Sequence, residues 1–85
     1  GLQEGLEKGL AKGLQEGLAK GLQEGLRTGL LEAIAVGLEL RFGAAGLRLL
    51  PEIAAIQDVG LLRAVLTHLK VAQAPEELRA IYRHE

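Results

Sequence analysis

The first 28 residues repeat a four-residue unit, G-L-x-x, in which every fourth residue is glycine and a leucine follows each glycine. A glycine in a helix interior costs about 1 kcal/mol relative to alanine, so the repeat opposes helix formation by roughly 7 to 8 kcal/mol. Burying a leucine returns about 1.5 to 3 kcal/mol, but only where another surface covers it. We therefore expect an isolated helix here to be largely unfolded and an ordered one to have a partner.

The spacing of the repeat also indicates how such a partner packs. Four residues turn a helix by about 400°, so each glycine lies roughly 40° further round, and the stripe winds in a right-handed sense. Consecutive G-x-x-x-G spacings let two backbones approach closely at a right-handed crossing, with the adjacent leucines beside the contact. We predict a helix-helix interface formed by the repeat residues Gly5, Gly9, Gly13, Gly17, Gly21, Gly25, Leu6, Leu10, Leu14, Leu18, Leu22 and Leu26.

A flexible, glycine-rich linker is the alternative for this segment, because glycine tracts form flexible coil. The regular leucines argue against a linker, since linkers lack large apolar side chains. Helicity that rises with concentration would favour self-association, and constant low helicity would favour a spacer.

From about Gly29 the glycines thin out and the pattern becomes that of ordinary amphipathic helices. We expect the first helix to run to about residue 42, either unbroken or broken near Gly29 or Gly37. Gly43 follows where a left-handed C-terminal residue is usual, and GAAG at 43–46 forms a short connection. Phe42 is expected to fill the core, with Arg41 capping the last turn of its own helix.

Proline and aspartate mark the later helices. Pro51 starts a helix or kinks one that begins near Leu47, and Asp58 is a candidate N-cap for a helix running to about Ala72. Pro75 lies in the first turn of the last helix. The chain is thus predicted to be all-α, with a long Gly-Leu tetrad-repeat helix (1–28) followed by a small helical C-terminal domain (29–85). The predicted core consists of Leu31, Ile34, Leu38, Phe42, Leu62, Val65, Leu66, Leu69, Leu78 and Ile81.

The composition excludes most chemistry. The chain has no Ser and no Cys, and Thr28 and Thr67 lie in helical patterns without a neighbouring base, so nucleophilic catalysis is not expected. His68 and His84 are isolated from any cluster of carboxylates or thiolates, which predicts surface or interface side chains and no metal site. We expect no catalytic residue, cofactor or metal.

The charge pattern limits the partners. Ten Lys and Arg against eleven Asp and Glu leave a net charge of −1 with no basic run, and QDVGLLRAVLTHLK is too poor in basic residues for a groove-reading helix. Charged residues recur too often for a membrane span, and no signal peptide begins the chain. We expect a cytoplasmic homo-oligomer, with a dimer favoured, that contacts neither nucleic acid nor membrane. The first residue is Gly, which we interpret as the start of a processed or partly observed piece.

Beyond the repeat, L-E-L-R-F-G at 38–43, L-L-P-E-I at 49–53 and E-E-L-R-x-I-Y at 76–82 are the most distinctive stretches. With the tandem repeat before them, they resemble the C-terminal tail of the Rpn family of recombination-promoting nucleases, transposase-like members of the PD-(D/E)XK nuclease superfamily. The resemblance covers nearly the whole chain. It implies a parent protein with an N-terminal, metal-dependent DNA endonuclease domain, a dimeric or higher assembly, and a variable helical tail. In some members a separate C-terminal product binds and restrains the full-length enzyme, which makes the parent protein a second expected partner.

The nuclease motif itself is absent from these residues. That chemistry needs an Asp and a Glu-x-Lys that together hold Mg²⁺ and activate water, whereas Asp58 is the sole Asp and no Glu-x-Lys occurs. We therefore predict a non-catalytic oligomerisation and regulatory module. The alternative is a flexible spacer with a helical cap that positions the nuclease domain of a larger enzyme.

Overall fold

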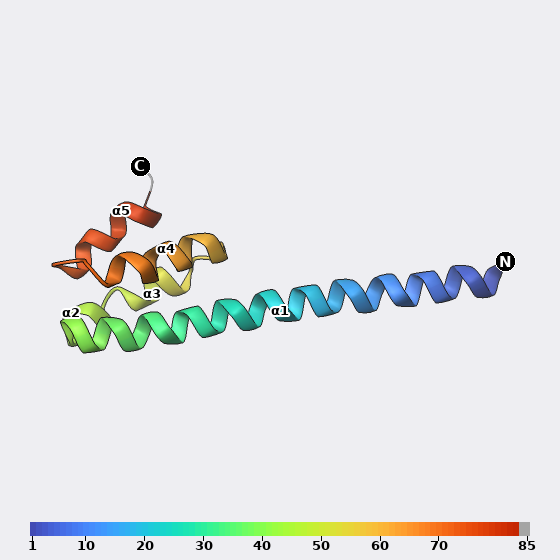
Figure 1. Cartoon of the computed structure of the whole chain (residues 1–85), viewed down its shortest axis with the longest axis horizontal. Helices are drawn as coiled ribbons and strands as arrows, with labels where there is room; N and C mark the ends of the chain where they lie inside the picture. Colours follow the sequence, from blue (N-terminus) through green and yellow to red (C-terminus); the bar gives the residue numbers. More distant parts are fainter. Residues whose placement is uncertain (84–85) are drawn as a thin grey trace.

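The computed structural model describes residues 1–83, and within them the regular structure is entirely helical (Figure 1). The all-α fold, with one long helix followed by short ones, is confirmed. The elements in chain order are α1 (Leu2–Phe42), α2 (Ala44–Leu47), α3 (Leu50–Ala54), α4 (Val59–Leu69), the 3₁₀ helix η1 (Pro75–Leu78) and α5 (Arg79–Tyr82).

Helix α1 spans 41 residues and continues unbroken through Gly29 and Gly37. It ends at Gly43, whose φ of 61° is the one positive φ in residues 1–83 and whose N–H donates to the carbonyl oxygen of Glu39. Glycine adopts a positive φ without the steric cost that a Cβ imposes, so the chain can reverse here. The ψ of −140° lies outside the left-handed helical region, and most of the connection expected at 43–46 belongs to the short helix α2 (Ala44–Leu47).

The molecule is elongated. Its radius of gyration is 18.1 Å and its extents are 62 × 27 × 19 Å, whereas a compact chain of this length would have a radius of gyration of about 12 Å. Figure 1 shows the cause: the elements after α1 fold back along its C-terminal part and leave its N-terminal part projecting alone. We call the part after α1, residues 44–83, the cap.

The core lies between the C-terminal part of α1 and the cap. Six of the ten predicted core residues are buried, and the other four are partly buried and pack against them. The buried six are Ile34, Leu38, Leu62, Val65, Leu69 and Leu78, and the partly buried four are Leu31, Phe42, Leu66 and Ile81. Leu49, Ile53 and Ala72 are also buried, although the sequence pattern did not predict them as core.

The later helices begin where the sequence predicts. The Asp58 carboxylate accepts hydrogen bonds from the N–H groups of Gly60 at 2.8 Å and Leu61 at 3.3 Å, so it is the N-cap of α4. That helix ends at Leu69, three residues before the expected Ala72. Pro51 and Pro75 lie in the first turns of α3 and η1, and the latter is 3₁₀ where an α-helix was expected.

Two arginines of α1 fasten the ends of the cap helices. Arg41 was expected to cap its own helix, but its guanidinium reaches across and donates to the carbonyl oxygens of Lys70 and Ala72, just after α4. Arg27 likewise donates to the carbonyl oxygens of Ala54, the last residue of α3, and of Ile56 beyond it. The last carbonyls of a helix lack partners within it, which explains why both side chains bind there.

Candidate helix-association surface

One series of large apolar residues runs along the whole of α1 at four-residue spacing. Its first seven members, the leucines from Leu2 to Leu26, are 44% to 85% exposed. Its last four, Leu30, Ile34, Leu38 and Phe42, are buried or packed against the core. The cap thus covers one end of a continuous apolar stripe and leaves the other end bare.

The glycines of the same repeat are bare as well. A Cβ built on any repeat glycine from Gly1 to Gly29 would meet no other atom within 4 Å, apart from its neighbours along the helix. All twelve residues predicted as the helix-helix interface therefore lie exposed on α1, and nothing in residues 1–83 covers them.

Gly37 lies eight residues after Gly29, in the same four-residue register, and it allows a second helix to approach α1 closely. A Cβ there would lie 2.5 Å from Cδ2 of the buried Leu69, so the missing side chain lets α4 approach α1 closely. Within one chain, Gly37 and the adjacent buried Leu38 thus lie in a helix-helix contact, in which the glycine faces the side chain of Leu69.

The exposed series does not lie on one face of α1. Each step of four residues turns it by about 40°, so the seven bare leucines wind through roughly 240° around the axis. Because a helix buries a stripe about 100° wide against a neighbour, one straight partner covers three or four consecutive leucines. The twelve predicted interface residues thus cannot all contact a single straight helix.

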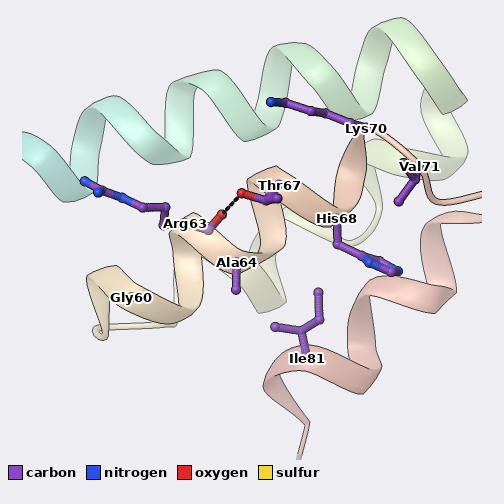
Figure 2. A pocket seen from close by; sticks show the side chains of 8 residues that line it. All are labelled: Gly60, Arg63, Ala64, Thr67, His68, Lys70, Val71 and Ile81. Carbon is purple, nitrogen blue, oxygen red and sulfur yellow. Dashed lines mark hydrogen bonds between the residues drawn. The ribbon is translucent and has the colours of Figure 1, made fainter.

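A second candidate surface is the open groove between α4 and α5, with a volume of about 640 Å³. Figure 2 shows Ala64 of α4 and Ile81 of α5 facing each other across it, with His68 projecting toward α5. Thr67 donates its hydroxyl to the Arg63 carbonyl oxygen at 3.0 Å within the same helix. The groove is shallow and mainly apolar, and the one hydroxyl that lines it donates within its own helix.

The main cluster of charged side chains has a structural role. Arg79 of α5 donates to Glu52 of α3 at 2.7 Å, and Tyr82 donates to the same carboxylate at 3.4 Å. The hydrogen bond from Arg79 is the largest cause that lowers the pKa of Glu52, and burial raises the pKa of Tyr82. The cluster ties α5 to α3.

Residues 1–83 contain no group of three or more His, Asp or Glu side chains placed to bind a metal ion. Thr28 is exposed on α1, and the prediction for His84 lies outside the described residues. In the same part of the chain, no helix has both the length and the apolar character to cross a bilayer. The chain matches no family model, no curated protein and no solved structure, so its resemblance to the Rpn tail stays a prediction.

The link between the repeat and the core was not predicted from the sequence. Ile34, Leu38 and Phe42 continue the four-residue spacing of the repeat leucines, so the stripe crosses the boundary that we drew at residue 28. The signal was in the spacing, since extending the leucine register by four steps from Leu26 passes through Leu30 and reaches all three residues.

Proposed function

We propose that the chain is a non-catalytic self-association module, in which the cap stabilises the C-terminal part of α1 and the bare part of α1 binds other copies. The supporting observation is the single apolar stripe that the cap covers from Leu30 to Phe42 and leaves exposed from Leu2 to Leu26. Seven exposed leucines at regular spacing form a larger apolar surface than the scattered single residues of ordinary monomers.

The partner in this proposal is protein, in line with the near balance of acidic and basic side chains. If the chain is the tail of an Rpn-like nuclease, its self-association would hold the nuclease domains of several copies together. A separately made tail would then bind the full-length protein through the same surface.

A spacer is the second candidate, supported by the length of α1. A helix of 41 residues is about 60 Å long and would hold whatever precedes it well away from the cap. In this form the segment is a rod, which differs from the flexible coil that we considered from the sequence.

Light scattering across a concentration series separates the two candidates. Self-association predicts a molar mass above the 9.0 kDa of one chain, falling on dilution. Changing both Leu18 and Leu22 to Gln should shift the mass toward one chain, because each change removes an exposed leucine and keeps helix propensity. Val71→Gln is the matched control, since Val71 is 69% exposed but lies after α4. A mass of 9.0 kDa at every concentration would leave the spacer as the better proposal.

The same proposal predicts that the chain does not cut DNA with Mg²⁺ or Mn²⁺, because it lacks the carboxylate and lysine set of that chemistry. Metal-dependent nicking by the purified chain, abolished by EDTA, would show that a catalytic site exists in these residues.

A further inference from the structure

The side of α1 that points away from the cap has a straight apolar face. Eighteen residues make about five full turns of a helix, so Leu18 aligns with Val36, and Leu22 aligns with Leu40. All four side chains are exposed, at 61%, 57%, 75% and 80% respectively. They lie opposite the side of α1 that the cap covers, because Val36 and the buried Leu38 are about 200° apart.

Small residues fill the middle of this face. Gly25, Gly29 and Ala33 lie between the two pairs of large residues and are exposed, and the two glycines have open space around them. We define the back face as Leu18, Leu22, Gly25, Gly29, Ala33, Val36 and Leu40. It is about 33 Å long and runs straight along the helix axis, whereas the repeat leucines wind around that axis.

The order of residues along the back face is symmetric about Gly29. Leu18 and Leu40 are equally far from Gly29 on either side, as are Leu22 and Val36, and Gly25 and Ala33. A two-fold axis through Gly29 would therefore place large residues beside large ones and small beside small. We propose that the back face binds the back face of a second copy, antiparallel, with Gly29 at the centre. This inference rests on the proposed self-association and narrows its contact to the part of α1 from Leu18 to Leu40, which includes two of the seven bare leucines.

The sizes of the side chains fit such a pair. Two helices that cross at about 20° and approach to about 8 Å at Gly29 are about 10 Å apart at Leu18 and Leu40, 11 residues away, which is the usual range for packed helices. The axes are closest where the side chains are smallest and separate where leucines fill the gap. The cap lies on the other side of α1 and does not obstruct the pair (Figure 1).

The charges favour the antiparallel orientation. None of the seven back-face residues is charged. Glu32 borders the back face, and the proposed register places it level with the uncharged Leu26 of the other copy. A parallel pair in register would instead bring Glu32, about 40° from the direction of Val36, beside its own copy, and like charges repel.

Cysteine pairing tests the contact, because the chain has no cysteine of its own. In the proposed pair, Cα atoms at positions 18 and 40 of different copies lie about 5 Å apart, within the disulfide range of 4.4 to 6.8 Å. We expect a mixture of the Leu18→Cys and Leu40→Cys variants to form a mixed disulfide dimer in a glutathione redox buffer. Either variant alone should form at least tenfold less dimer, because the two cysteines, at the same position in the two copies, are about 33 Å apart in the proposed pair. A mixture of Leu10→Cys with Leu40→Cys is the matched control and should not cross-link.

Three other outcomes would contradict the back-face contact, and one of them would also contradict the proposed function. Efficient cross-linking of Leu18→Cys with itself would show a parallel pair and overturn this inference. Absence of the mixed disulfide in a chain that light scattering shows to be oligomeric would overturn the back-face contact while the proposed function stands. Absence of the disulfide in a monomeric chain would overturn both.

Discussion

Gly46 is the glycine whose missing side chain matters most for the fold. It is buried in α2, and a Cβ there would lie 2.6 Å from the backbone oxygen of Leu38. Backbone cannot move aside as the end of a side chain can, so Gly46→Ala should push α2 away from α1. We expect it to destabilise the fold by about 1 to 3 kcal/mol, measured by chemical denaturation.

Gly13→Ala is the matched control for this change. Nothing lies within 4 Å of a Cβ at Gly13, and alanine favours helix by about 1 kcal/mol. The two substitutions should therefore have opposite signs. A Gly46→Ala variant as stable as the parent would show that α2 does not pack on α1 as described.

Glu52 gives the cap a dependence on pH. Its carboxylate is 31% exposed and receives the hydrogen bond from Arg79, which lowers its pKa below the ordinary value of 4.5. A carboxylate with a lowered folded-state pKa contributes stability above its unfolded pKa and loses it as the pH falls through the folded one. Between about pH 6 and about pH 3, we expect the melting temperature of the parent to fall further than that of Glu52→Gln. Equal losses in the two proteins would show that the ion pair contributes nothing to stability.

Sequence and structure agree best for residues whose role is local. Asp58 as N-cap and Gly43 with its positive φ follow from the chemistry of a helix end, which the neighbouring residues decide. Arg41 was predicted wrongly because its side chain is long enough to reach another helix, and the neighbouring sequence does not show which helix will be near.

At the scale of the elements, the glycines of α1 fall into two groups, those on the back face and those outside it. Gly25 and Gly29 lie on the back face, whereas Gly5 and Gly9 lie N-terminal to it, and all four are open to solvent in the single chain. Changing either pair to alanine should raise helix propensity by up to about 2 kcal/mol. The Gly25→Ala, Gly29→Ala variant should nevertheless associate more weakly, because its methyl groups hold the two helices apart.

Sedimentation velocity over a concentration series would measure that difference. The Gly5→Ala, Gly9→Ala variant is the control and should associate at least as tightly as the parent. If both variants associate equally well, the small residues of the back face are not at the contact.

The sequence predicted the type and extent of α1 well, since leucine spacing and Gly43 together mark a helix that ends at Phe42. It did not predict the back face. Its large residues lie on both sides of the boundary assumed at residue 28, with Leu18 and Leu22 before it and Val36 and Leu40 after it. In the sequence they therefore look like parts of two unrelated patterns. Their common direction becomes evident once α1 is known to be one unbroken helix.

At the scale of the whole molecule, the chain has a packed half and a bare half. The packing of Leu49, Ile53 and Ala72 into the core depends on how α3 and the end of α4 fold back, which periodicity along the chain does not specify. Two arginines and the Glu52 cluster then hold these short segments in place. Within residues 1–83, no such contacts support the bare half of α1.

Hydrogen exchange along α1, followed against protein concentration, tests most directly whether a second copy covers the back face where it extends into the bare half. At low concentration, amides of residues 30–42 should exchange slowly beneath the cap, and those of residues 2–26 should exchange fast. As concentration rises, we predict that protection spreads into residues 18–26, where the back face begins. Exchange in residues 18–26 that stays equally fast at every concentration, while the molar mass rises above that of one chain, would contradict the account.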